Sequence, residues 1–88
     1  MTRPSPYHAL ALVWDDEFEE HVAPRNITGW ECREVFDNQP RFRENAADRT
    51  ADYAMYGVTD AGRRLRVYVV WDDDQARTLR AVTAWDNR

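Results

Sequence analysis

The sequence contains no lysine, a single cysteine and no long apolar run. Cys32 has no second cysteine with which to form a disulfide, which fits a reducing cytosol. No apolar stretch approaches the roughly 20 residues that a membrane-spanning helix needs. The apolar segment 9–14 is also too short, and lies too far along the chain, for a secretion signal. These absences predict a cytoplasmic protein with no membrane partner.

The 88 residues are enough for one domain, which is predicted to span residues 1–88 and to begin with a flexible leader, residues 1–8. Apolar residues make up 43% and charged residues 32% of the chain, a balance that favours a folded protein over a disordered one. A domain this small buries only about 60–65% of the surface of its unfolded chain, so its core is thin.

Charge is distributed unevenly along the chain. The segment 15–20 is acidic at every position except Phe18, whereas most arginines follow residue 40. The net charge of −4 argues against a general coat for nucleic acid. The exclusive use of arginine is typical of a GC-rich genome, and at individual positions it also suits bidentate recognition of phosphate.

The stretch 62–71 is the longest run of β-branched and aromatic residues, and it alternates. Turn residues bound it on both sides, at 60–62 and at 72–74. It is therefore predicted to be the middle strand of an antiparallel meander. Its apolar side chains point to one face (Leu65, Val67, Val69 and Trp71) and its polar ones to the other (Arg64, Arg66 and Tyr68).

Two short helices are predicted before this strand. Asp15 or Asp16 caps the first helix, which Pro24 ends, and Thr28 with Glu31 has the capping-box spacing that begins the second. The predicted fold class is α+β, an antiparallel sheet of three to five strands with the two short helices packed on one face. The expected elements are strand 8–14, helices 16–23 and 28–37, edge strand 41–43, polar loop 44–50, and strands 52–58, 64–71 and 77–85.

The strand register decides which side chains share the arginine-bearing face. A turn of residues 59–62 pairs Val58 with Arg63. An odd-length loop after the middle strand places Arg80 beside Tyr68, whereas an even-length loop turns Arg80 toward the apolar face. Because burial of an unpaired guanidinium is costly, the odd-length loop is preferred. The face is then expected to carry Arg64, Arg66 and Arg80 around Tyr53, Tyr68 and Met55.

Several short motifs occur in an order that is typical of one family. They are Val13-Trp14-Asp15, His21-Val22-Ala23-Pro24-Arg25-Asn26-Ile27-Thr28, Glu34-Val35-Phe36 with Pro40, Gly62-Arg63, and Leu79-Arg80-Ala81-Val82-Thr83-Ala84. With these motifs the chain resembles, over residues 10–85, the BrnT-type toxins of bacterial type II toxin–antitoxin modules, small relatives of the RelE-like ribonucleases. It departs from the family at Arg25-Asn26, where His-Gly is usual, at Trp85, where arginine is frequent, and at Arg88, after which members usually add a helix.

The resemblance implies a toxin that cuts RNA without a metal or other cofactor, inhibits translation and is held in check by a cognate antitoxin. Such cleavage needs a base for the ribose 2′-OH, cations for the charged phosphorane and an acid for the leaving 5′-oxygen. Arginine suits the second task through its planar fork, and histidine suits the other two because it titrates near neutral pH. The predicted catalytic residues are Arg64, Arg80 and His21, and the predicted RNA-binding residues are Arg66, Tyr68, Arg63 and Arg25.

These residues also have plainer interpretations. Outward arginines can simply solvate a one-sided sheet, His21 can pack at the edge of the core, and Tyr68 can be the cross-strand partner of Tyr53. The adjacent acids at 72–74 point in different directions and so predict a solvated turn rather than a metal site. Cys32 lies on a predicted buried face with no base beside it.

Two functions from different classes therefore remain open. One is the toxin-type endoribonuclease, and the other is a non-catalytic protein-interaction module with the same fold. A thin core with four tryptophans also predicts a homodimer, or another complex, that covers Trp85. The acidic segment 15–20 is expected to attract a basic partner such as the antitoxin.

Overall fold

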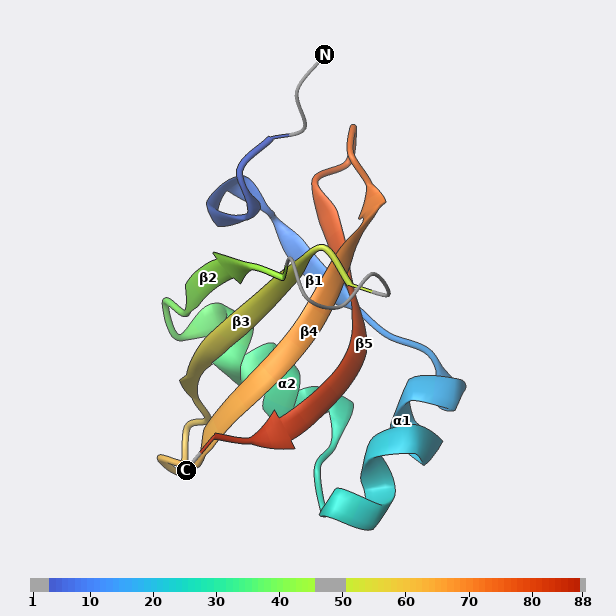
Figure 1. The fold of residues 1–88 in the computed structure, drawn as a ribbon, viewed down its shortest axis with the longest axis vertical. Coiled ribbons are helices and arrows are strands. Elements are labelled where there is room, and N and C mark those ends of the chain that lie inside the picture. The colour runs from blue at the N-terminus through green and yellow to red at the C-terminus, as the bar shows by residue number, and fades with distance from the viewer. Residues whose placement is uncertain (1–3, 46–50, 88) are drawn as a thin grey trace.

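A computed structural model describes residues 4–45 and 51–87, which form a five-stranded sheet with two α-helices (Figure 1). The predicted α+β class is confirmed. Residues 1–3 of the expected leader and residues 46–50 of the expected polar loop lie outside the described ranges. The elements are η1 (Pro6–His8), β1 (Ala11–Val13), α1 (Asp16–Val22), η2 (Ala23–Arg25), α2 (Gly29–Asp37), β2 (Arg41–Glu44), β3 (Tyr53–Val58), β4 (Arg64–Asp73) and β5 (Thr78–Asp86), where η marks a 3₁₀ helix.

The strand β4 lies at the centre of the sheet, as predicted, and the strand order is β1-β5-β4-β3-β2. Strands β2 to β5 pair antiparallel, but β1 runs parallel to β5. The prediction of a purely antiparallel sheet was wrong. Hairpin loops force the antiparallel pairing of consecutive strands, whereas β1 meets the last strand across a long connection that allows either direction.

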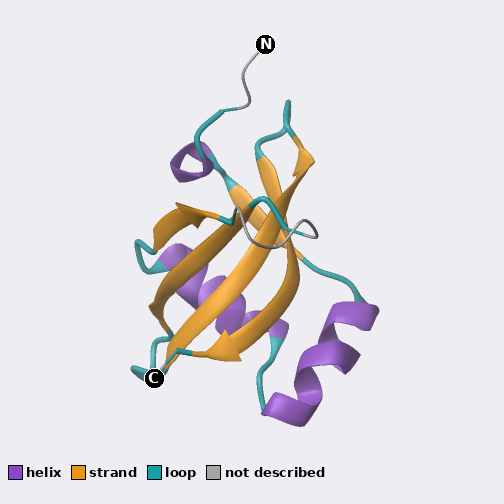
Figure 2. Cartoon of the chain, viewed as in Figure 1, coloured by secondary structure: helices purple, strands orange, loops and turns teal. Residues whose placement is uncertain are grey.

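The helices begin and end where the local sequence dictates. The Asp15 carboxylate caps α1 by accepting a hydrogen bond from the Phe18 N–H at 2.9 Å. Thr28 and Glu31 form the predicted capping box, and Asn26 has the left-handed φ of 58° that separates η2 from α2. In Figures 1 and 2, α2 lies behind the sheet and α1 stands beside β5. Within the described ranges no helix has both the length and the apolar character needed to cross a membrane.

Part of the expected leader is folded onto the sheet. Ser5 caps η1, and the Tyr7 ring meets Phe42 edge to face at 5.0 Å. The Tyr7 hydroxyl also accepts a hydrogen bond from the Phe42 N–H at 3.0 Å. Tyr7 therefore connects this segment to the edge strand β2.

The register between β3 and β4 differs by one residue from the predicted register. Val58 pairs with Arg64 rather than with Arg63. The cause lies in the loop, where the Thr59 N–H donates to the Arg63 carbonyl at 2.8 Å and Arg63 thereby joins the connection. As a result Met55 and Tyr53 lie on the core side of the sheet, not on the arginine-bearing face.

The loop between β4 and β5 has an even number of residues, whereas an odd number was predicted. Asp73 pairs with Thr78, so the connection has an even number of residues, 74–77. Arg80 nevertheless points away from the core and pairs with Val70 rather than Tyr68. A bulge between Trp71 and Asp73 compensates for the even loop length. Its extra residue, Asp72, shifts the pairing by one position and returns Arg80 to the face that carries the arginines of β4.

A second bulge shapes the core side of β5. Val69 pairs with Ala81 and Tyr68 pairs with Thr83, so Val82 is the extra residue. Ala81 and Ala84 are consequently both buried although they are three positions apart. The core consists of Leu12, Phe18, Val22, Ile27, Cys32, Val35, Met55, Leu65, Val67, Val69, Trp71, Leu79, Ala81 and Ala84.

We expect the Cys32 thiol to stay unreactive in the folded protein. The side chain is fully buried, and this burial, with smaller contributions from Glu31 and Glu19, raises the pKa of Cys32 to about 12. Because the folded pKa lies above the ordinary value of 9.0, the contribution of this thiol to stability is complete below pH 9 and is lost as the pH rises toward 12. A disulfide reagent at pH 8 should modify Cys32 only at the rate of unfolding, and modification as fast as that of a free thiol would contradict this burial.

Candidate functional site

The side of the sheet opposite α2 concentrates arginine and aromatic side chains, and we call it the open face. Its arginine, aromatic and hydroxyl side chains come from four strands, and they are Arg41 and Arg43 (β2), Tyr56 (β3), Arg64, Arg66 and Tyr68 (β4), and Arg80, Thr83 and Trp85 (β5). Among the described residues no carboxylate pairs with the four arginines of β2 and β4. These four arginines therefore present positive charge that no described carboxylate neutralises locally.

Arg66 lies at the centre of this face among three aromatic residues. Its cross-strand partners are Tyr56 on β3 and Trp85 on β5, and Tyr68 follows two positions along β4. The guanidinium carbon lies 5.6 Å from the centre of the Tyr68 ring. The Arg66 Nε is enclosed and has no hydrogen-bond acceptor among the described residues. An enclosed donor without an acceptor lowers the stability of the fold. Arg66 is therefore unlike an arginine that only keeps the surface of the sheet hydrated.

Arg25 joins the open face from η2. Its guanidinium carbon lies 3.4 Å from the centre of the Trp85 ring, close enough for a cation–π contact. The Arg25 Nη1 also donates to the Thr83 hydroxyl at 3.2 Å and to the Ala84 carbonyl at 3.4 Å. Of the predicted RNA-binding residues, Arg25, Arg66 and Tyr68 thus lie together.

A hollow of about 370 Å³ lies between α1 and β5, and we call it the edge hollow. Two of the three predicted catalytic residues, His21 and Arg80, line it. The Arg80 Nε lies 3.4 Å from the Asp72 carboxylate, and both side chains are nearly half exposed, so this ion pair is weak. Thr83 belongs to both the edge hollow and the open face, so the two surfaces adjoin. The lining is Asp15, Glu17, Phe18, His21, Arg80, Ala81, Val82 and Thr83.

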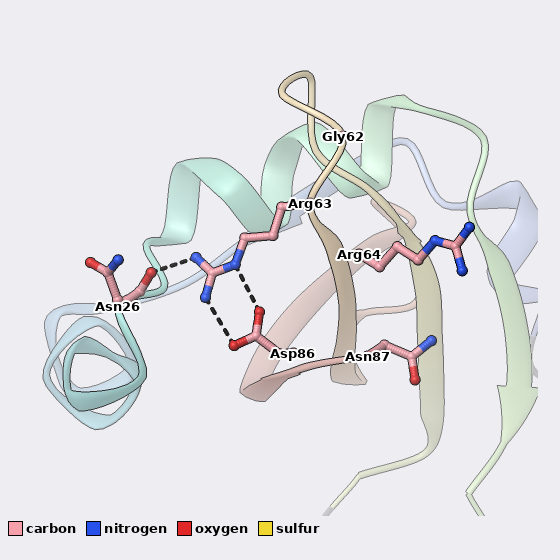
Figure 3. Close-up of a pocket in the computed structure, with 6 residues that line it drawn as sticks. All are labelled: Asn26, Gly62, Arg63, Arg64, Asp86 and Asn87. Carbon is pink, nitrogen blue, oxygen red and sulfur yellow. Dashed lines mark hydrogen bonds and ion pairs between the residues drawn. The ribbon is translucent and has the colours of Figure 1, made fainter.

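Arg63, the remaining predicted RNA-binding residue, forms hydrogen bonds and ion pairs within the protein and does not join the open face. Figure 3 shows its guanidinium directed toward Asp86 and the backbone of Asn26. Its Nε donates to Asp86 at 2.8 Å, and its Nη1 lies 3.2 Å from Glu31. It also donates to the Arg25 carbonyl at 3.1 Å. We call this set the Arg63 clamp. The hydrogen bonds to Asp86 and Glu31 raise the pKa of Arg63 further above its ordinary value.

Arg64, the third predicted catalytic residue, extends away from the Arg63 clamp in Figure 3. It lines a separate hollow of about 530 Å³ together with Asn26, Gly62 and Asn87. The structure therefore places Arg64, Arg66 and Arg80 on one face of the sheet, as predicted. His21 meets Arg80 in the edge hollow, but Arg64 lines a separate hollow, so the three predicted catalytic residues do not share one pocket.

Several open-face residues were absent from the sequence prediction. The predicted pairing of Val58 with Arg63 puts Met55 on the arginine-bearing face and Tyr56 beside it on the apolar face, whereas Met55 is the better core residue and signals the correct register. The alternation of Arg41 and Arg43 around Phe42 was a second usable signal. Thr83 and Trp85 reach the open face because of the bulge at Val82, and no residue pattern in the sequence indicates this bulge.

The described residues contain no cluster of three or more His, Cys, Asp or Glu that would hold a metal ion. No family model matches the sequence, and no curated protein matches it. The function therefore rests on the geometry of the open face and the edge hollow.

Proposed function

We propose that the chain binds RNA across the open face and cleaves it at the edge hollow, as the metal-independent endoribonuclease of a cytoplasmic toxin–antitoxin pair. The observation that carries the proposal is the position of His21 and Arg80 in one hollow that adjoins a face where Arg41, Arg43, Arg64 and Arg66 pair with no carboxylate of the described residues. Arginines without internal partners are free to bind phosphate, and RNA supplies one phosphate per nucleotide.

The reaction follows from the chemistry of these two side chains. His21 accepts the proton of a ribose 2′-OH, and the 2′-oxygen forms a bond to the adjacent phosphorus. The fork of Arg80 stabilises the charge that develops on the phosphorane oxygens. The bond from phosphorus to the 5′-oxygen then breaks as this oxygen takes a proton from water, and His21 releases the proton that it accepted to the solvent. The products are a 2′,3′-cyclic phosphate and a 5′-hydroxyl.

The acidic side of α1 offers a place for the antitoxin. Asp16, Glu17 and Glu20 are exposed on this helix, and Glu17 lines the edge hollow. A basic segment of the antitoxin would be attracted to these carboxylates and would cover His21 and Arg80. Inhibition then amounts to blocking access of RNA to the hollow.

The proposal is tested with the wild-type chain, labelled single-stranded RNA and a metal chelator. We expect cleavage products with cyclic phosphate ends, and growth inhibition when the chain is expressed without a partner. The matched control is DNA of the same sequence, which has no 2′-OH and should bind without being cut. RNA that stays intact under these conditions, together with normal growth, would reject the enzymatic proposal.

A second candidate function, a non-catalytic interaction module, is favoured by a different observation. Large apolar side chains are exposed away from the open face, with Leu10 71% and Trp30 68% accessible. Trp30 also contacts Trp14 edge to face at 5.6 Å. Exposed apolar groups of this size are typical of protein contacts, including contacts within a homodimer. Absence of RNA cleavage combined with a concentration-dependent dimer would support this alternative.

A further inference from the structure

The three aromatic residues around Arg66 suit flat ligands better than they suit a double helix. Tyr56, Tyr68 and Trp85 come from three adjacent strands and lie on the same face. Neighbouring strands are about 4.8 Å apart, and diagonal positions on adjacent strands about 7–8 Å. Tyr68 therefore starts about 7–8 Å from each of the other two residues, and Tyr56 and Trp85, which flank β4, start about 10 Å apart. Aromatic rings stack on bases of any sequence, provided that the bases are unpaired.

Each ring is accompanied by a guanidinium group. The distance from the guanidinium carbon to the ring centre is 5.6 Å for Arg66 and Tyr68, 6.0 Å for Arg43 and Tyr56, and 3.4 Å for Arg25 and Trp85. A base stacked on one of these rings would bring its own phosphate close to the accompanying arginine. Alternating rings and cations match the alternating bases and phosphates of a single strand. Bases inside a duplex are paired and stacked on one another, so their faces cannot reach the rings.

We propose that Tyr56, Tyr68 and Trp85 form a stacking surface for unpaired bases, with Arg66 at its centre as a phosphate contact, so that single-stranded RNA is the substrate class. This inference rests on the proposed RNA-binding function and adds its selectivity. The enclosed Nε of Arg66 fits this role, because the guanidinium lies beside the Tyr68 ring and pairs with no carboxylate of the described residues. Its terminal nitrogens remain free of partners among the described residues.

The test is a set of binding measurements with a short 2′-O-methyl RNA, which cannot be cleaved because the 2′-oxygen carries a methyl group. Fluorescence anisotropy gives the Kd for this strand alone and for the same strand in a duplex. We expect the wild-type chain to bind the single strand at least about tenfold more tightly, given the usual contribution of stacking. Tyr68→Leu should weaken single-strand binding about tenfold, whereas Tyr68→Phe, which keeps the ring, should bind like the wild type.

The matched control is Trp30→Leu, which removes an exposed aromatic residue from α2 on the far side of the sheet and should leave the Kd unchanged. Arg66→Gln should reduce the slope of log Kd against log salt by about 1, the amount that one lost phosphate contact accounts for. The thermal melting of each variant identifies any loss that comes from misfolding.

The outcomes separate the two proposals. If the wild-type chain binds neither strand nor duplex, the RNA-binding function itself fails. If it binds RNA but prefers the duplex, or if folded Tyr68→Leu binds like the wild type, the function stands and the stacking surface is rejected. An unchanged salt slope in Arg66→Gln would remove the phosphate contact from the proposal.

Discussion

Replacement of Arg80 by alanine should lower the rate of RNA cleavage about a hundredfold or more, because the transition state loses its phosphate contact in the edge hollow. The melting temperature should hardly change. The ion pair of Arg80 with Asp72 spans 3.4 Å between side chains that are 45% and 44% exposed, and such pairs contribute only about 0–1 kcal/mol. Cleavage rates measured at saturating RNA, together with thermal melting, check both expectations.

Two further variants define what Arg80 does. Arg80→Lys should recover only part of the rate, because a point charge cannot pair with two phosphate oxygens at once. Arg33→Ala removes an arginine from the exposed side of α2, where it pairs with Asp37, and should cleave at the wild-type rate. If Arg80→Ala is folded and cleaves as fast as Arg33→Ala, Arg80 has no part in the reaction and the edge hollow loses its assigned role.

Replacement of Arg63 by alanine should have the largest effect on stability, lowering the free energy of unfolding by about 2–3 kcal/mol. One side chain connects η2, the start of α2 and the end of β5, through Asp86, Glu31 and two backbone carbonyls. Its removal takes the Arg63 donor away from each of these partly enclosed acceptors and breaks the connection between the three segments. For a domain of this size the melting temperature should fall by roughly 10 °C or more.

Arg33→Ala serves as the matched control for stability as well. Its partner Asp37 is four residues away on the same helix, and the two side chains are 41% and 54% exposed, so the loss should stay below about 0.5 kcal/mol. Arg63→Lys should fall between wild type and alanine, because an ammonium group cannot reach all the acceptors of the fork. Equal melting temperatures for Arg63→Ala and Arg33→Ala would show that the Arg63 clamp does not stabilise the fold.

The helices and strands were predictable because their signals are local. The capping box of Thr28 and Glu31 and the left-handed position of Asn26 depend on a few neighbouring residues, and the structure contains both. The alternation of β4 likewise identified its buried and polar faces, and thereby placed Arg64, Arg66 and Tyr68 on one side.

Pairing between strands was harder to predict because small changes in the loops and bulges shift it. One hydrogen bond from Thr59 to Arg63 moved the register of β3 by a residue and turned Met55 inward. Two bulges in the β4–β5 pair then decided which residues of β5 reach the open face. The hydrogen bond from Arg63 to Asp86 could not be predicted from a local sequence pattern either, because the two residues are distant in the chain.

The parallel pairing of β1 with β5 has a consequence for the order of folding during protein synthesis. Ala11 pairs with Thr78 and Val13 with Arg80, so the first strand cannot find its place until the last one has left the ribosome. Contacts between segments so distant in the chain form slowly, because a long loop must close first. The edge hollow, which needs α1 beside a completed β5, is therefore among the last features to form on the nascent chain.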